Sequence, residues 1–447
     1  MSISMNAVDT IAAIATPPGE GAIAMVRISG TDALGIVHSI FHPSSKAAGI
    51  TPRIATYGRI QDGSETLDQV LVTLFKAPAS FTGEDMAEIT CHAGILLSAR
   101  ILELVLRSGA RAATAGEFSQ RAFFNGKIDL TRAEAIMDII RARTPLALRA
   151  AALQLDGRLG SEILTLRGQV MEIVAHIEAW IDFPEEGINP ATGRMLAEKI
   201  SSTLAQTRNL LSTADEGRVL REGVRVAIVG KPNAGKSSLL NRLLGMDRAI
   251  VSEIPGTTRD TIEESAILHG ILFRLTDTAG LRETADPIER EGVARTSRAI
   301  EGADIILHVV DCTESESITP VHEGEILLLN KSDLLPSGSS RPSRGICISS
   351  LTGEGLEDLV EAMIQATGIQ HLSSGDSLAA INARHKSLLE ATRSALEAAL
   401  LLVRDNAPPE LPAIELRSAL DTLGQIVGTT DTEDILGEIF GRFCIGK

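Results

Sequence analysis

Residues 225–238 read RVAIVGKPNAGKSS, and this stretch decides the fold. The apolar run at 226–229 is typical of a buried strand, and GKPNAGKS after it matches the pattern G-x-x-x-x-G-K-[ST] at the start of a helix. Glycines let the backbone wrap a phosphate, and amides at a helix start face the anion. We therefore predict that Lys236 reaches the β- and γ-phosphates of a nucleotide and that Ser237 ligates Mg²⁺. An ordinary strand–turn–helix is the weaker interpretation, because the full motif is matched in its required context.

Two later motifs follow predicted strands. Asp277-Thr278-Ala279-Gly280 offers a carboxylate that can hold Mg²⁺ through water, and Gly280 can place an amide beside the γ-phosphate. Asn330-Lys331-Ser332-Asp333 ends the run EILLL, and its last carboxylate can accept both N–H groups on the edge of guanine. Adenine has no such pair of donors, so the nucleotide is predicted to be GTP. Ser349-Ser350-Leu351, where a guanine loop is expected, is a weak match.

The groups that promote hydrolysis are less defined. Leu281 follows the second motif, so no glutamine stands there to orient water. The segment 252–260 (SEIPGTTRD) supplies many carbonyls, and Asn233 lies inside the phosphate loop; a monovalent cation held by such oxygens can act in place of an arginine finger. The water-orienting residue is left open among Glu283, Asp286, Glu289 and Glu291, which also suit a solvated helix start.

The chain shows three textures. Residues 1–122 are mixed α+β, with strand-like runs at 11–15, 22–28, 69–75 and 87–92 and a helix near 96–106. Residues 123–217 and 371–447 are helical, with an apolar stripe from Ile163 to Ile181. Residues 218–370 alternate strands and helices, which predicts a mostly parallel sheet. Because a lone amphipathic stretch cannot bury its stripe, we predict one discontinuous helical domain with the α/β domain inserted into it.

The composition excludes several protein classes. With 447 residues, of which 44% are hydrophobic, the chain is expected to be globular with about three domains. A net charge of −16 excludes a broadly basic nucleic-acid surface. The four cysteines form no C-x-x-C pair, so neither a disulfide framework nor a cysteine zinc site is expected. No apolar run reaches membrane-spanning length and no secretion signal is visible, so we expect a cytoplasmic protein.

End to end, the chain resembles the MnmE (TrmE) family of tRNA-modification GTPases. The resemblance rests on the GTPase motifs with GTTRD and on ATPPGEGAIAMVRISG (15–30), SFTGEDMAEITCH (80–92), GEFSQRAFFNGKIDL (116–130) and FCIGK (443–447). It implies an N-terminal domain that binds folate and dimerises, and G domains that pair across their nucleotide faces when K⁺ and GTP are bound. It also implies a heterotetramer with the FAD-containing flavoprotein MnmG (GidA). Together they would add a carboxymethylaminomethyl or aminomethyl group at C5 of wobble uridine 34 in certain tRNAs. The carbon would come from 5,10-methylene- or 5-formyl-tetrahydrofolate. A binding-class GTPase of ribosome assembly is the alternative, and the absence of a basic tail counts against it.

The resemblance also implies site residues. It implies K⁺ ligands at Asn233, Ser252, Ile254 and Thr257, Mg²⁺ ligands at Ser237 and Thr258, a catalytic carboxylate at Glu289, and folate contacts at Arg27, Glu84, Lys127 and Lys447. The expected GTP-binding residues are Asn233, Ala234, Gly235, Lys236, Ser237, Ser238, Ser252, Glu253, Ile254, Pro255, Gly256, Thr257, Thr258, Asp277, Thr278, Ala279, Gly280, Asn330, Lys331 and Asp333.

Two cysteines complete these expectations. The family assigns Cys444 to the tRNA-modification step, and the neighbouring cations Arg442 and Lys447 favour its thiolate; a buried small hydrophobe is the alternative. Cys91-His92-Ala93-Gly94 stands where the family has a glycine-rich G-H-G-G, and its bulk is expected to tighten a turn and affect folate affinity.

Overall fold

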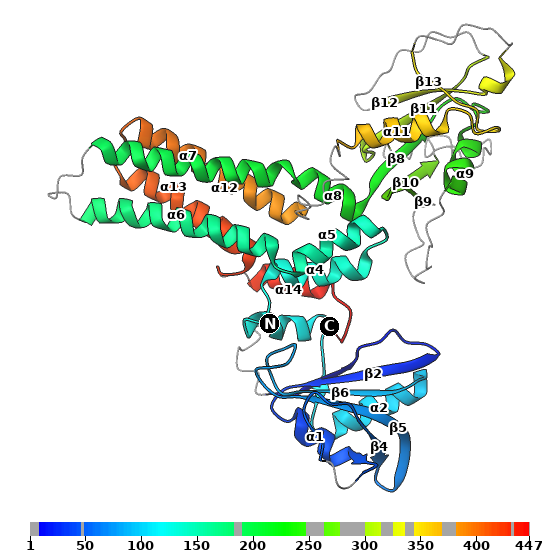
Figure 1. The fold of residues 1–447 in the computed structure, drawn as a ribbon, viewed down its shortest axis with the longest axis vertical. Coiled ribbons are helices and arrows are strands. Elements are labelled where there is room, and N and C mark those ends of the chain that lie inside the picture. Colours follow the sequence, from blue (N-terminus) through cyan, green and yellow to red (C-terminus); the bar gives the residue numbers. More distant parts are fainter. Residues whose placement is uncertain are drawn as a thin grey trace, which may run out of the picture. The chain divides into compact units, whose positions relative to one another are not determined.

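The computed structural model describes residues 9–45, 49–182, 190–246, 263–277, 300–313, 325–335, 344–368, 381–430 and 433–446. The chain divides into two compact units. The first comprises Met1–Met137 with Gly424–Lys447, and the second comprises Asp138–Leu423. Figure 1 labels most of the helices and strands of both units.

The first unit is built on a mixed sheet. Its strands are β1 (Ile11–Ile14), β2 (Gly21–Ser29), β3 (Phe41–Pro43), β4 (Thr56–Asp62), β5 (Glu65–Phe75), β6 (Met86–Ala93) and β7 (Arg111–Ala112). They are ordered β3-β4-β5-β6-β2-β1-β7, and every pair is antiparallel except β1 with β7. The four runs predicted as strands in this region all form strands, whereas β3, β4 and β7 were not predicted.

Alternation along the strands decides which face of this sheet is covered. In β2, Ala24, Val26 and Ile28 are buried in one core with helices α1 (Ala33–Ile40) and α2 (Ile95–Arg107). The helix predicted near 96–106 is α2. Because successive strand side chains point to opposite faces, Arg27 and Ser29 lie on the other face of β2.

The C-terminal segment completes this unit. Helices α3 (Glu117–Phe124) and α4 (Leu130–Arg141) follow the sheet in the chain. Helix α14 (Glu433–Gly441) belongs to the C-terminal segment. Leu130 and Ala133 of α4 share an apolar cluster with Leu436, Phe440 and Phe443. Beyond α14, Ile445 forms an isolated antiparallel bridge with Ala115, so the end of the chain lies against the sequence that precedes α3.

The helices of the second unit bury the predicted stripes. They are α5 (Pro145–Leu155), α6 (Arg158–Asp182), α7 (Pro190–Ser212), α8 (Ala214–Glu222), α12 (Ala383–Arg404) and α13 (Glu410–Val427). In α6 the stripe from Ile163 to Ile177 is buried, and Ile181 is partly buried. Helices α7 and α12 pack against each other, and an ion pair of 2.8 Å joins Arg208 to Glu397 across them.

The same unit contains a second sheet. Its strands are β8 (Val224–Val229), β9 (Glu263–Leu268), β10 (Ile271–Asp277), β11 (Ile305–Asp311), β12 (Glu325–Asn330) and β13 (Ile346–Cys347), in the order β13-β12-β11-β8-β10-β9. All pairs are parallel except the β9–β10 hairpin, as the alternating pattern predicts. Helices α9 (Lys236–Met246) and α11 (Leu356–Ala366) pack on it within one core, and η2 (Ser332–Leu334) follows β12. Among the described residues, no helix is both long and apolar enough to cross a bilayer.

Two glycines with the same backbone conformation test how the C-terminal segment docks. Gly116 and Gly126 have φ of 68° and 66°, and a Cβ on Gly116 would lie 2.5 Å from the Phe440 carbonyl oxygen, whereas one on Gly126 would meet nothing within 4 Å. Both Gly→Ala changes should cost about 1–2 kcal/mol of backbone strain. We expect Gly116→Ala to destabilise the protein by a further ~1–3 kcal/mol because the added atom displaces the segment. Melting temperatures measure this, and an equal loss in the two variants would contradict the close approach.

Candidate functional site

The candidate nucleotide site lies where parallel strands of the second sheet end. Strands β8, β11 and β12 run parallel, and their last residues are Val229, Asp311 and Asn330. The carboxyl ends of parallel strands meet at one edge of a sheet, where ligands of such folds bind. The phosphate loop leaves β8 at this edge and runs directly into α9.

The phosphate loop has a backbone that only its own residue types allow. Gly230 and Gly235 have φ of 148° and 97°, and Asn233, with φ of 64°, is an exposed non-glycine residue in the left-handed region. A Cβ on Gly230 would lie 2.1 Å from the Val309 carbonyl oxygen, so a larger residue is excluded there. Lys236 is buried, and its Nζ donates to the carbonyl oxygens of Gly230 (2.8 Å) and Lys231 (2.7 Å). This places an ammonium inside the loop, where phosphate oxygens are stronger acceptors than neutral carbonyls.

Asn330 connects the phosphate loop to the loop after β13. Its side chain is buried, and Nδ2 donates to the carbonyl oxygen of Ala234 at 2.8 Å. Its Oδ1 accepts from the backbone N–H of Ser350 at 3.0 Å and from the Ser350 hydroxyl at 2.9 Å. A Cβ on Gly235 would lie 2.1 Å from Asn330 Nδ2, so glycine is required beside this contact. One amide therefore joins the phosphate loop to the loop after β13.

The base-reading carboxylate belongs to the same assembly. Asp333 Oδ1 accepts a hydrogen bond from the hydroxyl of Ser349, whose side chain is buried. The Ser349-Ser350 pair, a weak match by sequence, thus lies against both Asp333 and Asn330. A carboxylate has about four acceptor positions, so Asp333 keeps capacity for the N–H pair of guanine.

Asp311, which the sequence analysis did not single out, pairs with a residue of the predicted base-reading motif. It ends β11, and its Oδ2 pairs with Lys331 Nζ at 2.6 Å. The hydrogen bond from Lys331 is the main reason that the pKa of Asp311 falls to about 2, so this carboxyl group is ionised at neutral pH. Lys331, two residues before Asp333 in the sequence, has φ of 66°. The ion pair with Asp311 fixes the position of its side chain. The order "VVD" at the end of an apolar run was the available signal.

Other predicted residues cannot be placed. Outside the described residues lie Ser252, Glu253, Ile254, Pro255, Gly256, Thr257, Thr258, Thr278, Ala279, Gly280, Glu283, Asp286, Glu289, Glu291 and Lys447. Asp277 is described only as the last residue of β10. Ser237 and Ser238 are exposed in the first turn of α9. Within the described part of the chain, no group of three or more His, Cys, Asp or Glu side chains is placed to hold a metal ion.

The predicted folate contacts of the first unit also converge. Arg27 of β2 lies opposite Glu88 of β6, and Nη2 pairs with Oε1 at 2.8 Å. Its guanidinium carbon lies 5.8 Å from the ring centroids of both Phe81 and Phe118, and Nη1 donates to the Gly446 carbonyl oxygen at 3.3 Å. Arg27 is therefore held next to the residue that precedes Lys447.

Glu84 and Lys127 lie at the neighbouring loop. Glu84 Oε2 accepts from the hydroxyl of Ser29, which is two residues from Arg27 on the same face of β2, at 2.8 Å. A Cβ on Gly83 would lie 3.3 Å from Lys127 Cγ, and Lys127 Nζ donates to the Pro78 carbonyl oxygen at 2.9 Å. The structure thus gathers a carboxylate and basic side chains from sequence regions that are far apart.

Two cysteines differ from expectation. Cys444 is exposed, and Phe443 beside it is the buried residue, so the interpretation of Cys444 as a buried small hydrophobe is wrong. Cys91 lies in strand β6 rather than in a turn, and it is buried in the core with α1 and α2. Burial raises the pKa of the Cys91 thiol. The bulk of Cys91 therefore fills the core and does not tighten a turn.

Two family models and full-length relatives match this chain. The family model "MnmE helical domain" matches residues 130–444, and "GTP-binding protein TrmE N-terminus" matches residues 10–127. The chain is 48% identical to the tRNA modification GTPase MnmE of Akkermansia muciniphila over 98% of this chain and 99% of that protein. It is 46% identical to the tRNA modification GTPase MnmE of Moorella thermoacetica, again over 98% of this chain and 99% of that protein.

Asp311 and Asp304 form a matched pair for testing the nucleotide site. Asp304 precedes β11 and pairs with Arg218 at 3.2 Å, whereas Asp311 ends the same strand. We expect Asp311→Asn to weaken GDP binding about three- to tenfold, because Lys331 loses a charge-assisted hydrogen bond. Asp304→Asn should leave the affinity unchanged. Titration with a fluorescent GDP analogue measures both, and equal affinities in wild type and Asp311→Asn would remove Asp311 from the site.

Proposed function

The chain belongs to the MnmE (TrmE) family of tRNA modification GTPases, and we propose that it is a K⁺-activated GTPase that modifies wobble uridine 34 of certain tRNAs. As a member of this family it is a GTP hydrolase that acts in tRNA modification. The observation that carries the proposal is the joining of the phosphate loop and the base-reading loop by Asn330. Because the nucleotide must lie between those loops, Lys236 would bind its phosphates and Asp333 its guanine edge.

Two cations would assist the reaction. Ser237 and Thr258 would hold Mg²⁺, and Asn233, with the main-chain oxygens of Ser252, Ile254 and Thr257, would hold K⁺. These cations supply positive charge to the phosphates as the bond to the leaving group breaks. The exposed side chain of Asn233, held in the left-handed region inside the phosphate loop, supports this role. We assign Glu289 to orienting the attacking water.

Folate would bind in the first unit. Glu84 would accept hydrogen bonds from the N–H edge of the pterin, and Arg27, Lys127 and Lys447 would bind the anionic glutamate tail. The gathering of these residues around β2 and the end of the chain supports the assignment. Tetrahydrofolate would supply the one-carbon unit. The exposed thiol of Cys444, two residues from Gly446, suits a part in the modification step.

The assembly follows from the same family. We assign residues 1–122 to a folate-binding, dimerising domain, 123–217 with 371–447 to a discontinuous helical domain, and 218–370 to an inserted G domain. GTP hydrolysis would drive pairing and separation of the G domains in a homodimer. A flavoprotein of the MnmG (GidA) type would bring FAD and complete a heterotetramer with tRNA in the cytoplasm.

Exchanging the monovalent cation tests the activation of hydrolysis. We expect GTP turnover in Na⁺ to be lower than in K⁺ by about two orders of magnitude, because the smaller ion fits the oxygen ligands poorly. Rb⁺, whose size is close to that of K⁺, should retain most of the rate. Asn233→Ala should abolish the difference between K⁺ and Na⁺. Phosphate release measures these rates, and equal turnover of the wild type in K⁺ and Na⁺ would refute a bound cation.

Genetic complementation tests the folate-dependent modification. In a strain that lacks this protein, we expect mass spectrometry of tRNA nucleosides to show loss of the C5 substituent at the wobble uridine. The wild-type gene should restore it, and Glu84→Gln should restore about a tenth or less. Glu65→Gln is the control, because Glu65 also pairs with an arginine, Arg100, but lies exposed on β5. Full restoration by Glu84→Gln would separate Glu84 from the reaction.

A further inference from the structure

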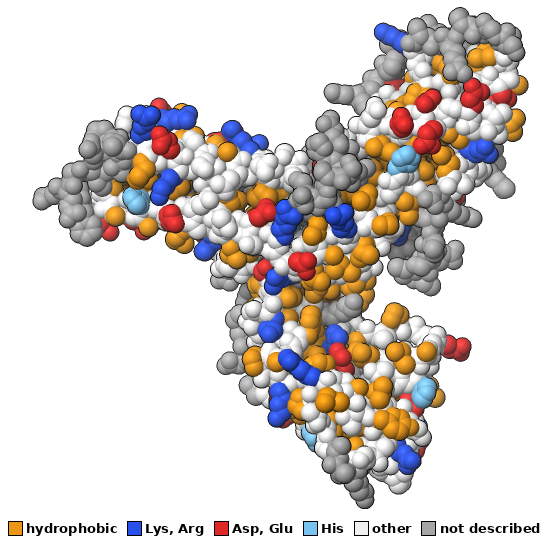
Figure 2. All heavy atoms as spheres, in the orientation of Figure 1, with side chains coloured by type: hydrophobic (Ala, Val, Ile, Leu, Met, Phe, Trp, Pro, Cys, Tyr) orange, Lys and Arg blue, Asp and Glu red, His pale blue; other side chains and the backbone are white. Residues whose placement is uncertain are grey.

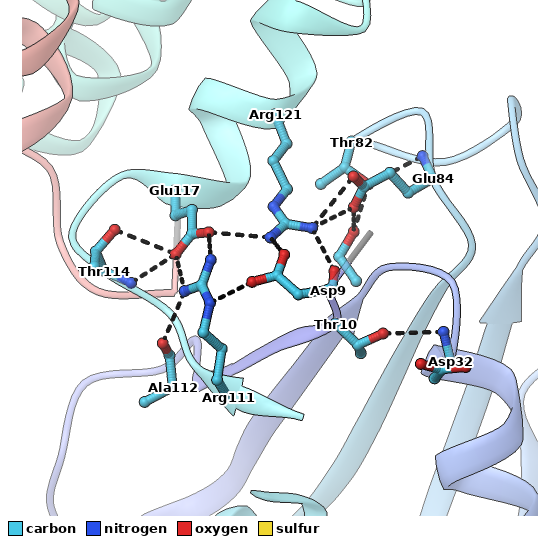
Figure 3. Close-up of polar contacts among 11 residues, drawn as sticks. Asp9, Thr10, Asp32, Thr82, Glu84, Arg111, Ala112, Thr114, Glu117 and Arg121 are labelled. Atoms are coloured by element: carbon cyan, nitrogen blue, oxygen red, sulfur yellow. Dashed lines mark hydrogen bonds and ion pairs between the residues drawn. The ribbon is translucent and has the colours of Figure 1, made fainter. Parts of the chain in front are cut away.

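A network of charges, buried at Glu117 and Arg121, lies beside the predicted folate contacts. It consists of Asp9, Glu84, Arg111, Glu117 and Arg121, as Figure 3 shows. Arg121, in α3, has only 7% of its side chain exposed and contacts all three carboxylates. None of these residues except Glu84 was singled out by the sequence analysis, although Glu117 and Arg121 stand in the GEFSQRAFFNGKIDL block.

Arg121 is held from one side and points toward Glu84 on the other. Its Nη2 pairs with Asp9 Oδ1 at 2.7 Å and with Glu117 Oε1 at 3.1 Å. Its Nη1 lies 3.2 Å from Glu84 Oε2 and 3.3 Å from Glu84 Oε1. A guanidinium is planar and presents its donors in a fixed fork, so the contacts with Asp9 and Glu117 determine where Nη1 meets Glu84.

Arg111 also pairs with two of the carboxylates that contact Arg121. Arg111 Nη1 donates to Glu117 Oε2 at 2.8 Å, and Arg111 also pairs with Asp9, so these two carboxylates are shared by both arginines. Burial alone would raise the pKa of Glu117, but hydrogen bonds from Arg111, Thr114 and Arg121 lower it overall. Glu117 therefore stays ionised at neutral pH. Among the five residues of the network, only Glu84 also contacts Ser29 of β2.

The hydrogen bonds to Glu84 leave one of its carboxylate oxygens able to accept a further hydrogen bond. Oε2 accepts from Ser29 at 2.8 Å and from Arg121, whereas Oε1 accepts only the 3.3 Å contact from Arg121 among the described residues. The Glu84 side chain is 22% exposed, in contrast to Arg121. A carboxylate has about four acceptor positions, so Oε1 is the oxygen that can take a ligand N–H.

We propose that Arg121 is a positioning residue for folate, which holds the Glu84 carboxylate so that Oε1 faces the N–H edge of the pterin. This rests on the proposed folate site and adds to it a residue that does not touch the ligand. Ser29 fixes Oε2, Arg121 fixes the rotation of the carboxylate plane, and Asp9 and Glu117 fix Arg121.

Calorimetry on the full-length protein with 5-formyl-tetrahydrofolate tests this role. We expect Glu84→Gln to weaken binding about tenfold or more, and Arg121→Lys, which keeps the charge but loses the fork, about fivefold. Arg121→Lys added to Glu84→Gln should change the affinity less than about twofold, because Arg121 acts only through Glu84. Arg100→Lys is the control for an ion pair elsewhere in the unit, with Glu65, and should bind as the wild type does.

The outcomes separate a positioning role from a structural one. Wild-type affinity in Arg121→Lys, or losses that multiply in the double variant, would overturn the positioning role and leave the folate site standing. A wild type without saturable heat would overturn the folate site, and the positioning role with it. If Arg121→Lys does not fold, Asp9→Asn replaces it, since the Asp9 side chain is 43% exposed and contacts Arg121. That change should weaken binding about two- to fivefold, and only when Glu84 is present; no loss would overturn the proposal.

Discussion

The predicted nucleotide site depends on the hydrogen bonds of the Asn330 side-chain amide. Its Nδ2 donates to the carbonyl oxygen of Ala234, and its Oδ1 accepts from the backbone N–H and the hydroxyl of Ser350. A buried amide that loses either partner bears the full desolvation penalty of that end, so the two loops are fixed with respect to each other. The spacing between the phosphate loop and the loop after β13 is thereby set by one side chain.

In the first unit, ion pairs rather than an amide hold side chains from distant segments together. Arg121 is nearly buried, and a buried guanidinium without partners would destabilise the fold by several kcal/mol. Three carboxylates offset that penalty, and one of them, Glu84, also faces the predicted folate site. The hydrogen bonds that stabilise the fold and those that orient Glu84 are therefore the same. The space-filling view in Figure 2 shows charged side chains interspersed with hydrophobic and uncharged ones on the face that it draws.

Sequence reasoning predicted what is local and missed what is distant. The phosphate loop, Asn330 and the predicted strands follow from short motifs and from periodicity, because their constraints act within a few residues, whereas β3, β4 and β7 were missed. Asp311 is twenty residues from Lys331, and Arg121 is 112 residues from Asp9, so neither pairing leaves a spacing that a pattern can show. Ser349 and Ser350 were undervalued for the same reason, since their role depends on Asn330 and Asp333. The exposure of Cys444 was open by sequence, because the alternation between Phe443, Cys444 and Ile445 depends on where the chain end docks.

The predicted folate site needs both ends of the chain. Arg27 and Gly446 are 419 residues apart, yet Arg27 Nη1 donates to the Gly446 carbonyl oxygen. A Cβ on Gly446 would lie 2.6 Å from the Ile14 carbonyl oxygen, so this glycine lets the chain end approach β1 closely. Closing a loop of this length carries an entropy cost that grows only logarithmically, and the apolar cluster of α4 with α14 can offset it. The position of Arg27 therefore depends on how residues 433–446 dock on the first unit, through the apolar cluster of α4 with α14 and the bridge of Ile445 with Ala115.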